Sequence, residues 1–402
     1  MNKVYIVAAQ RTAIGKFLGS LTPLSPADIA VPVIKNILAE TKINPADLDE
    51  VIVGNILMAG QKQGVARQAA IRAGIPHTVP AYGLNMICGS GMKSIINACQ
   101  NIRSGDAHLI LAGGTENMSN SGFVVPGSTM RGGQKMGDFK IIDHMVCDGL
   151  TDAFADYHMG VTAENIAEKY SITREQQDLF SFRSQQKAIA AVDSGRFKNE
   201  IVSVEIPSRK ETIVFDTDEF PNRATSPEKL AQLKPAFKKD GTVTAGNASG
   251  LNDGASFVLL ASEEAVKKYN LIPLVEVIAT GQGGVEPAIM GMGPVPAIVN
   301  ALQKAGKKLT DMEVIELNEA FAAQSLGVMR QLCEDHKVDN EWLSERTNLN
   351  GGAIALGHPI GASGNRITVS LVHEMLRSGK SLGLASLCIG GGMGTAVILK
   401  KV

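Results

Sequence analysis

Three side chains with nucleophilic or basic chemistry lie in glycine-rich motifs. Cys88 begins a Cys-Gly-Ser-Gly motif that is expected to head a helix. The positive end of the helix dipole would lower the pKa of its thiol, and its own amide could donate to an oxyanion. His358 lies in Gly-His-Pro-Ile-Gly-Ala-Ser-Gly and suits a base surrounded by backbone amides. Cys388 precedes Gly390 in a second glycine-rich stretch and could act as an acid or base.

Each of these residues also has a structural interpretation. Cys88 and Cys388 could be core cysteines at the ends of strands, and His358 could make only a structural hydrogen bond. Asn318 follows the predicted strand Val314–Glu316, so its side chain could face a ligand crevice at the carboxyl end of that strand. The alternative for Asn318 is an ordinary helix N-cap. The local patterns leave these alternatives open.

Other familiar sites are not supported by the sequence. A Ser-x-x-Lys match at 90–93 lacks the companion motifs of β-lactamases. Neither a phosphate-binding P-loop nor a dinucleotide fingerprint is present, which disfavours a nicotinamide oxidoreductase. The five cysteines are dispersed, so we expect neither a disulfide framework nor a metal site.

The elements that must position these residues form a loose internal repeat. Residues 85–114 and 357–392 both run from a small-residue turn through a helix and an Arg-Ser-Gly stop to a strand and a glycine turn. Gly105 and Gly379 are expected to end the two helices. Apolar β-branched runs alternate with helical patterns, which predicts an α/β fold with buried strands. A pseudo-twofold between two such halves would bring Cys88, His358 and Cys388 together.

The intervening segment differs in composition. Residues 119–249 hold long polar stretches, a capping-box helix starting at Thr173, and a region at 207–240 that is expected to be mostly loop. We predict an N-terminal half at 1–118 plus about 250–270, an inserted loop domain at 119–249, and a C-terminal half at 271–402.

Overall composition excludes several functional classes. The 402 residues carry a net charge of −1, with 44% hydrophobic and 20% charged residues. That balance lacks the basic footprint of a nucleic-acid-binding protein, and no apolar run is long enough to span a membrane. The first residues are expected to form a strand rather than a signal peptide, so we expect a cytoplasmic protein.

Six motifs in order resemble the thiolase family, and most closely its biosynthetic branch. The resemblance covers essentially the whole chain. It implies a five-layered α-β-α-β-α core of two duplicated halves with an inserted loop domain. The motifs are residues 85–91, 113–118, 244–254, 318–321, 357–364 and 388–394.

The resemblance also implies a reaction and the roles of its catalytic residues. The reaction is the reversible Claisen condensation of two acetyl-CoA molecules to acetoacetyl-CoA and CoA, with CoA as substrate and product and no further cofactor. Cys88 would carry the acetyl group, His358 would activate it, and Cys388 would move the α-proton. One oxyanion hole would combine His358 with a water held by Asn318, and the other would use the amides of Cys88 and Gly390.

By the same resemblance, the inserted domain would cradle CoA. His158 would contact pantetheine and favour short acyl chains. Arg223 could serve the nucleotide phosphates, although its surroundings depart from the family pattern. The polar stretch Glu334–Thr347 is longer than in related sequences and is expected to be a surface insertion. The other expected contact residues are Ser249, Ala245, Met159, Leu150, Phe237, Met290, Ala320 and Phe321.

A homotetramer joined through residues near 120–145 is expected from the family. Three alternatives remain at this stage: a degradative 3-ketoacyl-CoA thiolase of broader chain length, a β-ketoacyl synthase-like enzyme, and a non-catalytic lipid carrier. The second glycine-flanked cysteine, Cys388, and the inserted domain favour a thiolase over a synthase. A non-catalytic carrier is disfavoured because all four catalytic side chains are present, namely Cys88, His358, Cys388 and Asn318.

Overall fold

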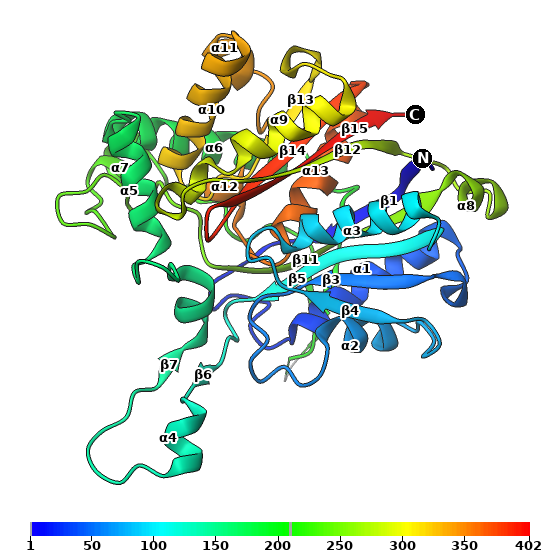
Figure 1. Ribbon diagram of the computed structural model, residues 1–402, viewed down its shortest axis with the longest axis horizontal. Coiled ribbons are helices and arrows are strands. Elements are labelled where there is room, and N and C mark those ends of the chain that lie inside the picture. The colour runs from blue at the N-terminus through cyan, green and yellow to red at the C-terminus, as the bar shows by residue number, and fades with distance from the viewer. Residues whose placement is uncertain (1, 209–210) are drawn as a thin grey trace.

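A computed structural model describes residues 2–208 and 211–402 (Figure 1). Its main sheet has two halves, ordered β4-β3-β5-β11-β1 and β12-β15-β14-β13, which join where Tyr5 and Ile6 pair with Glu276 and Val275. The principal strands are β1 (Val4–Thr12), β3 (Glu50–Gly54), β4 (Ala81–Leu84), β5 (Leu109–Asn117), β11 (Asn252–Ser262), β12 (Val275–Gly284), β13 (Val314–Leu317), β14 (Leu382–Ile389) and β15 (Met393–Lys401).

The two halves repeat one pattern of strand pairing. In the first half, β3 runs parallel to β5, and β11 lies antiparallel between β5 and β1. In the second half, β13 runs parallel to β14, and β15 lies antiparallel between β14 and β12. Thr347 forms a parallel β-bridge with Ile315 of β13. This bridge occupies the position in the second half that the pairing of β4 with β3 occupies in the first half. Most of Glu334–Thr347 is exposed or half-buried, as expected of a surface insertion, but its last residue, Thr347, is buried against β13.

Helices cover the sheet in layers, as predicted. Helices α1 and α2 pack outside the first half, and α9 and α10 pack outside the second. Helices α3 and α13 fill the middle layer, where their apolar side chains contact both halves (Figure 1). This confirms the α-β-α-β-α order of layers. The helices are α1 (Pro26–Thr41), α2 (Val65–Arg72), α3 (Ser90–Ser104), α9 (Pro294–Ala305), α10 (Ala322–His336) and α13 (Ser363–Ser378).

The two middle helices approach each other closely at their N-terminal ends. A Cβ atom on Gly91 would lie 2.8 Å from the amide nitrogen of Asn365, and one on Gly364 would lie 2.5 Å from that of Met92. Glycine therefore permits the contact that places the starts of α3 and α13 side by side. Gly105 and Gly379 end the two helices in the left-handed conformation, as expected.

Residues 119–249 form two visibly different parts. An arm containing β6, α4 and β7 projects from the body, and α5, α6 and α7 lie beside the second half of the sheet (Figure 1). Strand β8 instead pairs with β1, and β9 and β10 pack into the core of the first half. The region expected to be mostly loop, 207–240, also contains a short strand and a short helix. The elements are β6 (Phe123–Val124), α4 (Gly127–Gly132), β7 (Ile142–Asp143), a π-helical turn Met145–Leu150, α5 (Met159–Lys169), α6 (Arg174–Asp193), β8 (Ile201–Val202), β9 (Val204–Ile206), β10 (Ile213–Phe215) and α7 (Pro227–Ala231).

The remaining short elements are β2 (Gly15–Lys16), α8 (Glu263–Lys268), α11 (Asn340–Ser344), α12 (Ala353–Leu356) and three 3-10 turns at Pro45–Asp47, Pro287–Met292 and Leu309–Asp311. Across the described ranges, no helix combines the length and apolar character that crossing a membrane requires.

Candidate active site

A strained turn presents Cys88 at the start of α3. Ile87, the residue before it, has φ +46°, a left-handed conformation that is unusual for a β-branched residue. The buried Ser90 fixes the turn, because its hydroxyl donates to the Ile87 carbonyl at 2.7 Å and accepts from the Met86 amide at 2.8 Å. These bonds hold Cys88 in one orientation against the strain of its neighbour.

Residues from both halves of the fold form hydrogen bonds with His358. Its amide donates to Asn252 Oδ1 at 2.9 Å, and its Nδ1 lies 2.6 Å from Ser363 Oγ. The Ser363 hydroxyl is also 2.9 Å from the Pro359 carbonyl, to which it can donate its single hydrogen. Ser363 then accepts from Nδ1–H of His358, which leaves an unprotonated Nε2. That tautomer is the one a general base requires.

Asn318 lies directly behind the imidazole. Its Nδ2 is 3.5 Å from His358 Nδ1, and its Oδ1 is buried without a hydrogen-bond partner in the ranges that the structure describes. The next residue, Glu319, is anchored by Ser184 Oγ at 2.6 Å and Asn348 Nδ2 at 2.8 Å. The loop that carries Asn318 is thus tied to α6 and to the segment leading into His358.

Cys388 and Gly390 approach Cys88 from the second half of the sheet. Cys388 is the penultimate residue of β14 and lies next to the turn at 390–392, where Gly391 and Gly392 have φ +84° and +86°. The backbone amides of Gly390 and of Cys88 itself face the Cys88 sulfur and act to lower the pKa of its thiol. Two converging N–H groups of this kind can stabilise an oxyanion that forms next to the sulfur.

The surroundings keep all three reactive groups neutral. Burial raises the pKa of Cys88 to about 11, although the amides of Gly390 and Cys88 oppose that shift. Burial, followed by the charge of Arg366, lowers the pKa of His358 to about 3. Burial, followed by the proximity of Cys88, raises the pKa of the Cys388 thiol. The expectation that the helix start lowers the pKa of Cys88 was therefore wrong, because loss of solvent outweighs the favourable amides.

Cys88, His358, Cys388 and Gly390 line one largely apolar cavity of about 400 Å³. In the parts of the chain described, no group of three His, Cys, Asp or Glu side chains is arranged to hold a metal ion. Nine of the ten expected contact residues line the same cavity: Ser249, Ala245, His158, Met159, Leu150, Phe237, Met290, Ala320 and Phe321.

Three rings build one wall of this cavity. His158 stacks on Phe237 with ring centroids 4.6 Å apart, and Phe237 meets Phe321 edge-on at 6.0 Å. His158 Nδ1 accepts from the Gly160 amide and so caps α5. Burial lowers the pKa of His158, so this wall stays uncharged. A Cβ on Gly160 would overlap the Phe237 ring, which shows how closely α5 supports it.

Comparison with known proteins agrees with this arrangement. Residues 4–264 match the family model of the thiolase N-terminal domain, and residues 271–401 match that of the C-terminal domain. The chain belongs to the thiolase family. It is 54% identical to an acetyl-CoA acetyltransferase of Pseudomonas aeruginosa, with 100% of both thiolase chains covered.

Solved thiolase structures superpose over the whole chain. The acetyl-CoA acetyltransferase of Bacillus anthracis is 44% identical, with a TM-score of 0.95 and coverage of 100% of this chain and 99% of that chain. Human mitochondrial 3-ketoacyl-CoA thiolase, solved in complex with CoA, is also 44% identical, with a TM-score of 0.93 and coverage of 100% and 98%. The thiolase fold predicted from the six motifs is thereby confirmed.

One predicted contact residue of this thiolase is not brought to the cavity. Arg223 forms an exposed ion pair with Asp193 at 2.5 Å and does not line the cavity, so its role at the phosphates stays a prediction. Sequence analysis also missed Ser363, whose place one turn beyond His358 in the glycine-rich motif was the available signal. Further lining residues that were missed are Ile87, Met118, Met145, Val146, Gly149, Ala236, Ala248, Gly250, Leu251 and Ile360.

Proposed function

We propose that this thiolase is an acetyl-CoA C-acetyltransferase that condenses two acetyl-CoA molecules to acetoacetyl-CoA and CoA, and catalyses the reverse thiolysis. The observation that carries the proposal is the convergence of Cys88, His358, Cys388 and Gly390 in one cavity. Relatives named acetyl-CoA acetyltransferase support the same activity at 50–54% identity. CoA is substrate and product, and we propose no further cofactor.

In the first half-reaction, His358 Nε2 takes the Cys88 proton as the sulfur attacks the thioester carbonyl. The tetrahedral intermediate collapses, the C–S bond to CoA breaks, and the proton passes from His358 to the departing CoA sulfur. The products are acetyl-Cys88 and CoA. A neutral His358 with a low pKa fits this role, because its lone pair is available at neutral pH.

The second half-reaction requires Cys388 as a thiolate, which the neutral thiol of the free enzyme forms by releasing its proton to solvent. This thiolate removes a proton from the methyl carbon of a second acetyl-CoA. The resulting enolate attacks acetyl-Cys88, the C–S bond to Cys88 breaks, and the Cys88 thiolate takes up the proton held by Cys388. A water on Asn318 Oδ1 together with His358 would stabilise the enolate oxygen, and the amides of Cys88 and Gly390 would stabilise the tetrahedral oxyanion. In thiolysis the same Cys388 thiol protonates the departing carbanion.

The proposal is tested by CoA-dependent loss of the acetoacetyl-CoA enolate absorbance, with Cys88→Ser as the inactive control. We expect turnover by the wild type alone. A long-chain 3-ketoacyl-CoA is assayed in parallel. Met118 and Met145 line the cavity near Cys88, and their flexible apolar side chains could adapt to a longer acyl chain. Faster turnover of the long chain would replace the proposal with a degradative 3-ketoacyl-CoA thiolase. Absence of both activities would overturn it.

We also propose a homotetramer and a reducing, cytoplasmic location. Support for the assembly comes from the arm at 119–145, where Phe123, Met130, Met136 and Ile141 are more than half exposed. Apolar side chains gathered on a projecting arm are typical of an interface between subunits. Support for the location comes from the mechanism, which requires Cys88 and Cys388 to remain thiols. Light scattering of the purified protein tests the assembly, and a monomer would contradict it.

A further inference from the structure

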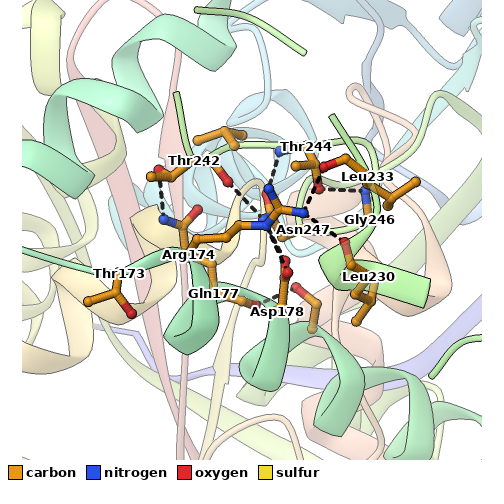
Figure 2. A network of polar contacts seen from close by, with 12 residues as sticks. Thr173, Arg174, Gln177, Asp178, Leu230, Leu233, Thr242, Thr244, Gly246 and Asn247 are labelled. Carbon is orange, nitrogen blue, oxygen red and sulfur yellow. Dashed lines mark hydrogen bonds and ion pairs between the residues drawn. The ribbon is translucent and has the colours of Figure 1, made fainter. Parts of the chain in front are cut away.

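A polar network behind the cavity connects the inserted domain to the loop that would bind pantetheine. Arg174, the first residue of α6, donates through Nε to Asp178 Oδ2 at 2.7 Å. Its Nη2 donates to the carbonyls of Leu230 at 2.7 Å and Leu233 at 2.9 Å (Figure 2). One guanidinium thus joins the start of α6 to the end of α7 and to Leu233 just beyond it.

The second carboxylate oxygen of Asp178 continues the network. Asn247 Nδ2 donates to Asp178 Oδ1 at 2.9 Å and to the Thr242 carbonyl at 3.1 Å, while Asn247 Oδ1 accepts from the Thr244 amide at 2.8 Å (Figure 2). Asn247 and Thr244 are completely buried, and Asp178 is nearly so. The Glu164 carboxylate also accepts from the amides of Thr242 and Val243 at the start of the loop 242–247. The amide of Asn247 fixes the rest of this loop, and Asp178 holds that amide in place.

This loop leads directly to the cavity wall. Ala245, Ala248 and Ser249 line the cavity, whereas Arg174, Asp178 and Asn247 do not. The Asn247 carbonyl accepts from the Ala322 amide at 2.8 Å, and the Ser249 amide donates to the Ala320 carbonyl at 2.9 Å. The same loop is therefore bonded to the segment that follows Asn318.

We infer that Arg174 and Asp178 are positioning residues for the pantetheine-binding loop of this enzyme. They act through Asn247, which fixes the positions of Ala245 and Ser249 in the cavity wall. Asn247 also bonds the loop to the 320–322 segment. The inference rests on the proposed function, because it assumes that this cavity wall receives the pantetheine arm of CoA. It assigns no contact between Arg174 or Asp178 and the reacting atoms.

Arg174→Gln is expected to raise KM for acetoacetyl-CoA and for CoA about tenfold, with kcat changed less than twofold, because a charged, branched set of hydrogen bonds is lost far from Cys88. Asp178→Ala should raise KM similarly. Asp178→Asn should raise it less, since the new amide oxygen can still accept from Asn247. Alkylation of Cys88 by iodoacetamide, which needs no CoA site, should keep its wild-type rate in all three.

Arg330→Gln is the matched control. Arg330 also pairs with a carboxylate four residues later, Glu334, and donates to a carbonyl at the end of another helix, Tyr170, but it has no bond to the loop 242–250. We expect wild-type KM and kcat from this variant. The inference is wrong if Arg330→Gln raises KM as much as Arg174→Gln, or if Arg174→Gln leaves KM unchanged.

A folding defect gives a different pattern. Arg174→Gln and Asp178→Ala could lose kcat, Cys88 alkylation and thermal stability together, which would show that the two residues are structural. Arg174→Lys, which retains the charge and one hydrogen bond, then decides the question. A raised KM with normal kcat in Arg174→Lys supports the positioning role, and any other result refutes it. Failure of the proposed function is separately visible, because the wild type would then show no turnover at all.

Discussion

Ser363 Oγ lies 2.6 Å from His358 Nδ1 and 2.9 Å from the Pro359 carbonyl. Since a hydroxyl has one hydrogen, donation to Pro359 leaves the Ser363 oxygen as an acceptor for the imidazole. The side chain of the first residue of α13 thereby selects which nitrogen of His358 can accept a proton from Cys88. The arrangement is comparable to the orienting third group of a nucleophile–base pair.

Ser363→Ala should lower kcat for thiolysis on the order of tenfold with little change in KM, because the imidazole loses the acceptor that fixes its tautomer. Steady-state kinetics with acetoacetyl-CoA measures this. Ser378→Ala is the control, since Ser378 lies on the same helix and also donates to a carbonyl four residues earlier, at 2.6 Å. Equal kcat values for Ser363→Ala and the wild type would refute the role of Ser363.

The two active-site cysteines should fail at different steps. Cys88→Ser is expected to form no acetyl-enzyme with acetyl-CoA, because a serine hydroxyl is a much weaker nucleophile in this setting. Cys388→Ser should still become acetylated at Cys88 yet turn over very slowly, because serine cannot exchange the α-proton. Intact-protein mass spectrometry detects the acetyl adduct. Full steady-state activity in either variant would contradict the assignment.

Alkylation of Cys88 should depend steeply on pH. Burial raises the pKa of Cys88 to about 11 and lowers that of His358 to about 3, so the free enzyme holds a neutral thiol–imidazole pair. Below the thiol pKa the thiolate fraction rises about tenfold per pH unit, and the iodoacetamide rate should follow it from pH 7 to 9. Peptide mass spectrometry separates Cys88 from the exposed Cys147. A rate that is constant over this range would instead indicate a thiolate–imidazolium pair.

Gly364→Ala should destabilise the protein by about 1–3 kcal/mol, the usual cost of overpacking a close contact. Its new methyl group would lie 2.5 Å from the Met92 nitrogen, and backbone atoms cannot simply rotate away. Denaturant unfolding measures the change. Gly83→Ala is the control, because a Cβ there meets only the Val53 carbonyl oxygen, at 3.7 Å. An equal free energy of unfolding for the two variants would show that α3 and α13 can move apart without loss of stability.

Much of the site could be predicted because its residues occupy equivalent places in a repeat. The motifs of Cys88 and His358 head helices α3 and α13, so recognising the repeat was enough to bring them together. Strand β11 has only a weak signal in the sequence, since its first residues are polar and its partners lie more than 100 positions away. The pKa of Cys88 was predicted in the wrong direction because desolvation depends on the surrounding fold. The bond between Asp178 and Asn247 has no local signature at all.

Strand β11 has a consequence for synthesis on the ribosome. It lies between β1 and β5, pairing Ile6 with Leu260 and Gly113 with Phe257. The first three-fifths or so of the nascent chain therefore emerges with a gap at the centre of its sheet, and two strand edges stay open until residue 262 has left the exit tunnel. Long-range closure of this kind is slow and leaves edges free to pair wrongly. Efficient production should thus favour conditions that protect this intermediate, such as slow translation or chaperones that shield open β-edges.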